Sequence, residues 1–282
     1  MRAKLFHNTS CQLGEGPLWV NNTLYFFDIE GNRLHALDEK AANHRSWDMG
    51  CYASAAGRLE SGKLLIATEH ALQIFDPEAG NSEHLIDLET DNTDTRSNDG
   101  RADRQGGFWI GTMSTSGKEN AGAIYRFYKG EVRKLVPNVS IPNAISFAPD
   151  GQTAYFTDTT KQMVYRWGLD PQGWPVGDPT PFYKPVNGAP DGAVVDSEGA
   201  LILALWGGSR AIRVTQDGAV THEFEIDASN VTCPAFGPDG RLYFTTAKAG
   251  LTDIEVAEQP SAGGIFVIDA PAPGQEEPIV QL

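Results

Sequence analysis

Short runs of β-forming residues, each bounded by glycine, aspartate, asparagine or proline, dominate the hydrophobic pattern of this chain. Six runs that follow a turn signal predict strands at residues 23–28, 63–68, 108–112, 153–158, 200–205 and 241–246. Later apolar runs predict third strands at residues 33–37, 72–75, 124–127, 163–167, 211–214 and 264–268. Amphipathic helical periodicity is scarce, so the pattern predicts an all-β fold.

The runs belong to a repeat that can be aligned on one position of each unit. In four segments a turn glycine stands eight residues after the aligned position, and two weaker copies precede them. The six aligned positions, called ring positions below, are Glu15, Ser54, Asn98, Asn143, Asp191 and Thr232. They lie 39 to 48 residues apart, which is the length of a propeller blade. We therefore predict a six-bladed β-propeller that forms a single domain over residues 1–282.

A propeller places the first strand of each blade beside the central channel. The ring positions stand at the start of those strands, so they should converge at one mouth of the channel. The last repeat holds too few residues for four strands, and we expect the N-terminal segment, residues 2–7, to complete the last blade. Two β-sandwich domains are the alternative architecture.

Composition and charge narrow the possible partners. The chain has 22 Lys and Arg against 37 Asp and Glu, a net charge of −15, which is the wrong sign for a nucleic-acid-binding protein. No apolar stretch of about 20 residues is present, and the N-terminus lacks the apolar core of a signal peptide. We expect a cytoplasmic protein with no membrane segment and infer no obligate protein partner.

Four ring positions carry side chains that can supply oxygen ligands. Glu15 and Asp191 offer carboxylates, and Asn98 and Asn143 offer amides. Two carboxylates are costly to bury together without a cation, and oxygen donors suit a hard divalent ion such as Ca²⁺, Mg²⁺ or Mn²⁺. Three protein ligands would leave positions open for water and substrate. The alternative is that these residues merely cap turns at strand starts.

The same residues carry a resemblance to a known family. The sequence is similar to the SMP-30/gluconolactonase/regucalcin-like family at residues 13–19, 96–100, 111–113, 141–143 and 190–192. Residues 205–208 resemble the bacterial sugar-acid lactonases of the family more than the animal regucalcins. The resemblance implies a six-bladed propeller that hydrolyses sugar lactones with one divalent metal ion.

The resemblance also implies roles for individual positions. It implies that Glu15, Asn143 and Asp191 bind the metal and that Arg96 and Asn98 contact the substrate. These ligands do not distinguish among Ca²⁺, Mg²⁺, Mn²⁺, Zn²⁺ and Fe²⁺.

Two positions depart from the family pattern. Ala144 follows Asn143 where the family usually has glycine, and Ser116 stands where some members have a substrate-binding glutamate.

A mechanism follows from this chemistry. The metal would polarise the lactone carbonyl and acidify a water molecule, with Asp191 as the candidate general base or as a ligand only. Arg96 offers donors that could stabilise the developing oxyanion. The predicted function is hydrolysis of a sugar (aldono-) lactone, a small-molecule substrate, to the sugar acid. A non-enzymatic Ca²⁺-binding protein of the regucalcin type and a partner-binding propeller remain alternatives.

Overall fold

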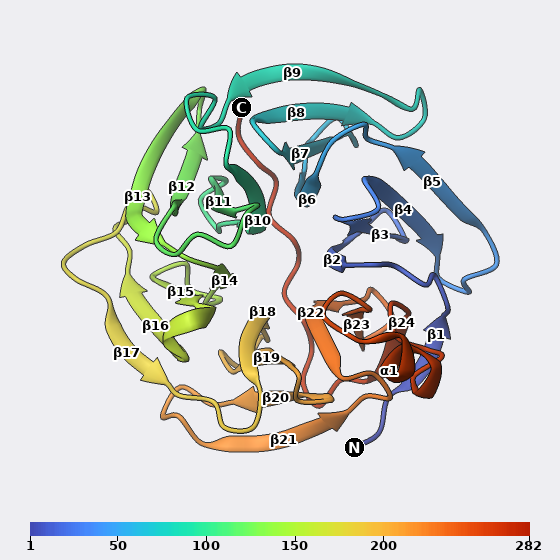
Figure 1. Cartoon of the computed structure of the whole chain (residues 1–282). Helices are drawn as coiled ribbons and strands as arrows, with labels where there is room; N and C mark the ends of the chain where they lie inside the picture. Colours follow the sequence, from blue (N-terminus) through green and yellow to red (C-terminus); the bar gives the residue numbers. More distant parts are fainter.

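Six four-stranded antiparallel sheets surround a central axis in the computed structural model, which describes residues 1–282 (Figure 1). Each sheet is one blade, so the prediction of a six-bladed β-propeller is confirmed. The single α-helix is α1 (Asp253–Glu258). No helix has the length and apolar character needed to cross a membrane.

The blades follow one another in sequence. Blade 1 comprises β2 (Gly14–Val20), β3 (Thr23–Asp28), β4 (Arg33–Asp38) and β5 (His44–Asp48). Blade 2 comprises β6 (Ala53–Arg58), β7 (Leu64–Thr68), β8 (Ala71–Asp76) and β9 (Asn81–Asp87). Blade 3 comprises β10 (Thr95–Ala102), β11 (Phe108–Ser114), β12 (Gly122–Tyr128) and β13 (Glu131–Val139).

The second half of the ring repeats this order. Blade 4 comprises β14 (Pro142–Phe147), β15 (Thr153–Asp158), β16 (Met163–Gly168) and β17 (Thr180–Tyr183). Blade 5 comprises β18 (Ala189–Val195), β19 (Leu201–Trp206), β20 (Arg210–Val214) and β21 (Val220–Glu225). Blade 6 comprises β22 (Asn230–Phe236), β23 (Arg241–Ala247), β24 (Ile265–Asp269) and β1 (Lys4–His7).

The N-terminal strand closes the ring, as the sequence predicts. Strand β1 pairs antiparallel with β24, with Lys4 opposite Val267 and Leu5 opposite Phe266. The first and last parts of the chain therefore share one sheet. Because the closing strand is held by main-chain hydrogen bonds, blade 6 keeps the same outer edge as the other blades.

The inner hairpins explain why the repeat shows so clearly in the sequence. In blades 2 to 6 the glycine eight residues after the ring position has φ between 69° and 88°. Glycine adopts this left-handed conformation without the steric cost that other residues meet. Blade 1 uses Asn22 at φ 63° instead, which is why its copy of the repeat is weaker.

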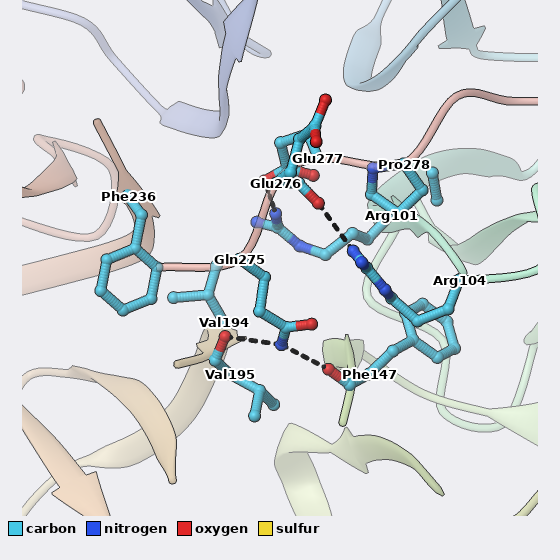
Figure 2. A pocket seen from close by; sticks show the side chains of 11 residues that line it. Arg101, Arg104, Phe147, Val194, Val195, Phe236, Gln275, Glu276, Glu277 and Pro278 are labelled. Carbon is cyan, nitrogen blue, oxygen red and sulfur yellow. Dashed lines mark hydrogen bonds and ion pairs between the residues drawn. The ribbon is translucent and has the colours of Figure 1, made fainter. Parts of the chain in front are cut away.

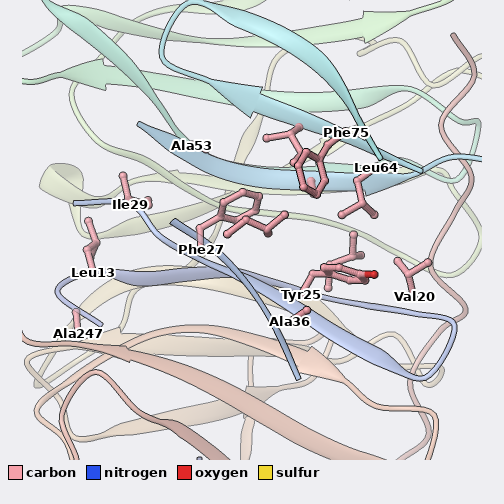
Figure 3. Close-up of a cluster of buried hydrophobic side chains, with 14 residues drawn as sticks. Leu13, Val20, Tyr25, Phe27, Ile29, Ala36, Ala53, Leu64, Phe75 and Ala247 are labelled. Carbon is pink, nitrogen blue, oxygen red and sulfur yellow. The ribbon is translucent and has the colours of Figure 1, made fainter. Parts of the chain in front are cut away.

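Hydrophobic side chains pack mainly between neighbouring blades. Figure 3 shows the cluster between blades 1 and 2, in which Tyr25 and Phe27 of β3 face Leu64 and Phe75. Full burial of side chains of this size contributes about 1.5–3 kcal/mol each. The packing fixes each inner strand relative to its neighbours and thereby fixes the ring positions.

The C-terminal strap, residues 270–282, crosses the axis at the end of the inner strands opposite to the ring positions (Figure 1, red). The Gln275 amide donates to the carbonyl oxygens of Phe147 and Val195 at 3.0 and 2.8 Å (Figure 2). The backbone N–H of Val280 donates to the Arg58 carbonyl at 2.9 Å. The strap thus connects blades that are far apart in the ring and covers this mouth of the channel.

Candidate active site

The five side chains that the sequence singles out line one cavity of about 360 Å³ at the other mouth of the channel. They are Glu15, Arg96, Asn98, Asn143 and Asp191. Each is at least nine-tenths buried. Residues separated by up to 176 positions in the sequence thus meet on the axis, as the repeat predicts.

Matching aspartates in opposite blades hold Glu15 and Asn143 in place. In blade 1 the Asp28 carboxylate accepts hydrogen bonds from the backbone N–H groups of Gln12 and Leu13 at 3.0 and 2.9 Å. The same arrangement recurs in blade 4.

There the Asp158 carboxylate accepts from the N–H groups of Ser140 and Ile141, both at 3.1 Å. In each blade the supported segment leads, two residues later, into a ring residue. A buried carboxylate with such N–H partners is well satisfied, so both supports are rigid.

The backbone turns sharply after these two ring residues. Gly16 and Ala144, which follow Glu15 and Asn143, have φ of 54° and 56°. At this point the pairing register also shifts between β2 and β3 and between β14 and β15. The departure from the family pattern at Ala144 therefore does not alter the conformation, although an alanine here carries the steric cost of the left-handed region.

The Asn143 amide is oriented by its neighbours on both sides. Its Nδ2 donates to the Thr159 hydroxyl at 2.9 Å, and that hydroxyl donates to the Pro190 carbonyl at 2.8 Å. Its Oδ1 accepts from Asn98 Nδ2 at 3.1 Å. With the nitrogen turned toward Thr159, the Asn143 oxygen is the atom available to a ligand in the cavity.

The Arg96 guanidinium lies beside the ring with part of its donor capacity unused. Its Nη1 donates to the Ser97 carbonyl at 2.8 Å and to Asn98 Oδ1 at 2.9 Å. Its Nε and Nη2 have no hydrogen-bond partner within the protein. Neither atom is fully buried, so both can donate to a ligand. Burial lowers the pKa of Arg96. A guanidinium nevertheless stays charged, so the cavity contains a fixed cation with free N–H donors.

Burial and neighbouring carboxylates raise the pKa of the two ring carboxylates, Glu15 and Asp191. Burial, together with the charge of Asp99, raises the pKa of Glu15 to about 8. Burial and the Glu15 charge raise the pKa of Asp191 well above its usual value. Arg96 and Arg101 oppose the shift at Glu15 but do not cancel it. The site can therefore accommodate further positive charge.

The residues present fit a divalent cation. Two carboxylates and an oriented amide oxygen are the donors that hard divalent ions prefer. A bound ion would offset the burial and the neighbouring negative charge that raise the pKa of Glu15 and Asp191.

Sequence reasoning missed several residues around this cavity. Glu30 and Thr159 line it. Asp99 supports the Asn143 turn, because its carboxylate accepts from the Ile145 N–H at 2.7 Å. Ser116 does not line the cavity.

The signals for these residues were weak for physical reasons. Glu30 lies in the turn between β3 and β4, and Thr159 follows β15, so neither is at a ring position. Asp99 is adjacent to the ring residue Asn98 and its role depends on a contact with the next blade. Equivalent positions in other blades carry different residues, so no repeat marks them.

Comparison with known proteins places this site in a family. Residues 13–248 match the model of the SMP-30/Gluconolactonase/LRE-like region. The chain belongs to this family. The resemblance inferred from the motifs around the ring is therefore confirmed.

Relatives and solved structures agree with this family assignment. The chain is 34% identical to L-arabinolactonase of Azospirillum brasilense, over 94% of this chain and 91% of that protein. It is 32% identical to a pentonolactonase of Haloferax volcanii, over 96% and 95%. A crystal structure of regucalcin from Agrobacterium tumefaciens, described as a calcium-binding protein, superposes with a TM-score of 0.96 at 34% identity, covering 100% of this chain and 99% of that one.

Proposed function

We propose that this protein is a metal-dependent sugar lactonase that hydrolyses an aldonolactone to the sugar acid. The observation that carries the proposal is the convergence of Glu15, Asn143 and Asp191 with Arg96 and Asn98 in one cavity. The relatives named L-arabinolactonase and pentonolactonase support lactone hydrolysis as the reaction of this family member.

Glu15, Asn143 and Asp191 would hold the divalent ion. When bound, such an ion polarises a carbonyl group and makes a nearby water molecule more acidic. Thr159 and Asn98 keep the Asn143 oxygen directed at the ligand position. Asp99 fixes the Asn143 turn from the neighbouring blade. Preorganised donors of this kind lose little free energy to rearrangement when a ligand binds.

Asp191 is our candidate general base. Its carboxylate lies in the cavity, where it can accept a proton from water that attacks the lactone carbonyl. If Asp191 serves only to bind the ion, the ion alone would acidify the attacking water. We infer no covalent nucleophile in the cavity. In both cases loss of this carboxylate removes activity.

Arg96 and Asn98 would bind the lactone. The free N–H donors of Arg96 can reach the carbonyl or ring oxygen and stabilise the negative charge that develops there. Asn98 supports Arg96 through its Oδ1 and shares its Nδ2 with Asn143, so it couples the substrate side of the cavity to the metal side.

Glu30 is a further candidate substrate contact. It lines the cavity at an exposed position, and its charge acts on Arg96. Arg96 donates to Ser97 and Asn98 and not to Glu30, so Glu30 remains free to accept hydrogen bonds from sugar hydroxyls. Its turn is fixed by the Gly31 N–H, which donates to Asp28 at 3.1 Å.

A non-enzymatic regucalcin-type protein is the second candidate, and it would use the same three ligands. The Agrobacterium tumefaciens protein described as calcium-binding motivates it. The cavity favours the enzyme, because an ion-binding site alone needs neither a space of about 360 Å³ nor an arginine with free donors beside it.

The test measures acid release from pentono- and hexonolactones with and without a chelator. We expect hydrolysis by the wild type, loss on chelation, and loss in Asp191→Asn. Asp178→Asn, at an exposed position away from the cavity, is the matched control and should keep full activity. Calcium binding without turnover of any lactone would instead favour the regucalcin-type protein.

A further inference from the structure

A second group of metal-binding side chains lies inside blade 1, outside the axial cavity. Cys11, Asp28 and His35 each place one ligand atom within 4.8 Å of the other two. Their exposed fractions are 1%, 9% and 6%. The Cys11 thiol is free, and none of the three lines the axial cavity.

We propose that Cys11, Asp28 and His35 bind one transition-metal ion of the Zn²⁺ class. Sulfur, nitrogen and carboxylate oxygen are together the donors that Zn²⁺ accepts in tetrahedral sites. A thiolate ligand disfavours Ca²⁺ and Mg²⁺, so this site would select a different ion from the oxygen-only axial site.

The charges of the donors suit a buried site. A thiolate and a carboxylate balance a divalent ion, and a neutral imidazole adds no charge, so the complete assembly has no net charge. Cys11 belongs to an apolar cluster with Trp19, Phe26 and Ile265. An uncharged assembly is far less costly in such surroundings than an isolated ion.

His35 is oriented as a metal ligand would be. Its Nδ1 lies 2.9 Å from Nε2 of His44, which leaves its own Nε2 as the free nitrogen. His44 is exposed and lies against the half-buried His7, with ring centroids 5.0 Å apart. Burial, with the His44 charge, lowers the pKa of His35 to about 4, so its ring is neutral at neutral pH.

Blade 4 shows that the fold itself does not need these donors. Asp158 has the same backbone N–H partners as Asp28, and the structural role of that carboxylate is therefore shared. The position of Cys11 is occupied in blade 4 by Val139, which likewise precedes the supported segment.

The position of His35 has a counterpart in blade 4 as well. His35 pairs with Phe26, and in blade 4 Tyr165 pairs with Phe156 at the same distance from the supporting aspartate. The need to support a ring residue thus explains why Asp28 is present. It does not explain Cys11 and His35, because blade 4 has neither a thiol nor an imidazole beside its aspartate.

Only a modest adjustment would be needed for binding. Ligand atoms of a tetrahedral zinc site stand about 3.3–3.8 Å apart, given the usual Zn–S and Zn–N distances. The present separations, each within 4.8 Å, would have to shorten by at most about 1.5 Å. Binding must also remove the thiol proton, whose pKa burial raises, so the apparent affinity should increase with pH.

The test titrates the chelated full-length protein with Co²⁺ in excess Ca²⁺, which occupies oxygen-only sites. We expect one equivalent of Co²⁺ to give thiolate-to-cobalt charge-transfer absorption. Cys11→Ser should lose the charge-transfer band and weaken Co²⁺ binding by at least about 100-fold. Cys51→Ser, a change at a half-buried cysteine outside the cluster, should keep the band.

A double variant guards against loss of folding. Cys11→Val with His35→Tyr copies the blade 4 residues, and its thermal melt reports whether the fold is retained. A folded double variant without the band supports the proposal. Absence of the band in the wild type, or its persistence in Cys11→Ser, overturns it. Lactone hydrolysis by Cys11→Ser should remain, so the outcome is independent of the axial site.

Discussion

Glu15 shows how a single buried carboxylate links ion binding to stability. Burial and the charge of Asp99 raise its pKa to about 8, so in the metal-free protein it is mostly protonated at neutral pH. An ion that binds this carboxylate must displace the proton. We therefore expect the apparent affinity of the axial site to rise with pH as Glu15 titrates.

Glu15→Gln should change the pH dependence of stability. The pKa of Glu15 is higher in the folded than in the unfolded state, so the folded protein binds more protons and loses stability as pH rises from about 4.5 to about 8, with no further loss above that pH. At alkaline pH the metal-free variant should be more stable than the metal-free wild type, by about 5 kcal/mol. Thermal melts of both chelated proteins across this range measure the difference, and parallel curves would contradict it.

Glu30→Gln should separate recognition from chemistry. A hydrogen bond to a charged group contributes about 1.5–3 kcal/mol, so KM for a sugar lactone should rise roughly 10-fold with little change in kcat. Hydrolysis of an unsubstituted lactone, which has no hydroxyl groups, should be unaffected. Glu60→Gln, at the opposite end of the inner strands, is the control. Equal losses on both substrates would argue against a role in hydroxyl recognition.

The turns after Glu15 and Asn143 direct these two side chains into the cavity. Gly16 and Ala144 share a left-handed backbone, and buried aspartates hold the segments that precede them. The alanine methyl at 144 is fully buried, so the steric cost of its conformation is partly offset by packing. Both blades thus reach the same geometry with different residues.

Substitutions at Ala144 should reveal this cost. Ala144→Gly relieves the strained φ but loses a buried methyl group and adds chain entropy, so stability should change by less than about 1 kcal/mol. Ala144→Val places a β-branched side chain in the left-handed region of a packed core and should cost about 2–4 kcal/mol. Urea unfolding of the two variants distinguishes them, and a stable valine variant would contradict the account.

At the scale of the strand, much of the fold could be predicted from the sequence. Predicted and observed second strands coincide at β3 and β15 and differ by one or two residues elsewhere. Turn glycines made the hairpins of blades 2 to 6 visible, because glycine tolerates the required φ at low cost. The fourth strands β5, β9, β13, β17 and β21 were not placed individually, since they are largely exposed and carry little hydrophobic signal.

Of the site residues, those at ring positions could be predicted from the repeat. Glu15, Asn143 and Asp191 share one register, so their convergence followed from topology. The contributions of Thr159, which donates to Pro190 of blade 5, and of Asp99, which accepts from Ile145 of blade 4, depend on contacts between blades that no local pattern encodes. Their roles in function, like those of the ring residues, remain proposals.

At the scale of the whole molecule, the ring is closed at its edge by β1 and at one mouth by the C-terminal strap. In the strap, Oε1 of Glu277 lies 2.7 Å from Nη1 of Arg101, a residue of β10 near the channel axis (Figure 2). Both side chains are mostly buried, with exposed fractions of 13% for Arg101 and 16% for Glu277. The strap therefore neutralises a buried cation as well as covering the channel.

Adjacent glutamates of the strap provide a matched test. Glu277→Ala leaves Arg101 buried without its partner and should destabilise the fold by about 3–5 kcal/mol. Glu276→Ala removes a pair with Arg58 in which the glutamate is 79% exposed, and should cost less than about 1 kcal/mol. Denaturant unfolding measures both. Equal losses of stability in the two variants would show that the strap does not depend on the buried pair. A single unfolding transition of the wild type would support the prediction of one domain.

The most direct test of the central claim is a stoichiometric return of metal to the chelated enzyme while acid release from a pentonolactone is recorded. With Mn²⁺, which prefers oxygen donors, the rate should rise in proportion to added ion and stop rising at one equivalent. Asp191→Asn should stay inactive throughout. A metal-free wild type that hydrolyses the lactone at full rate would contradict the assignment of Glu15, Asn143 and Asp191 as an essential metal site.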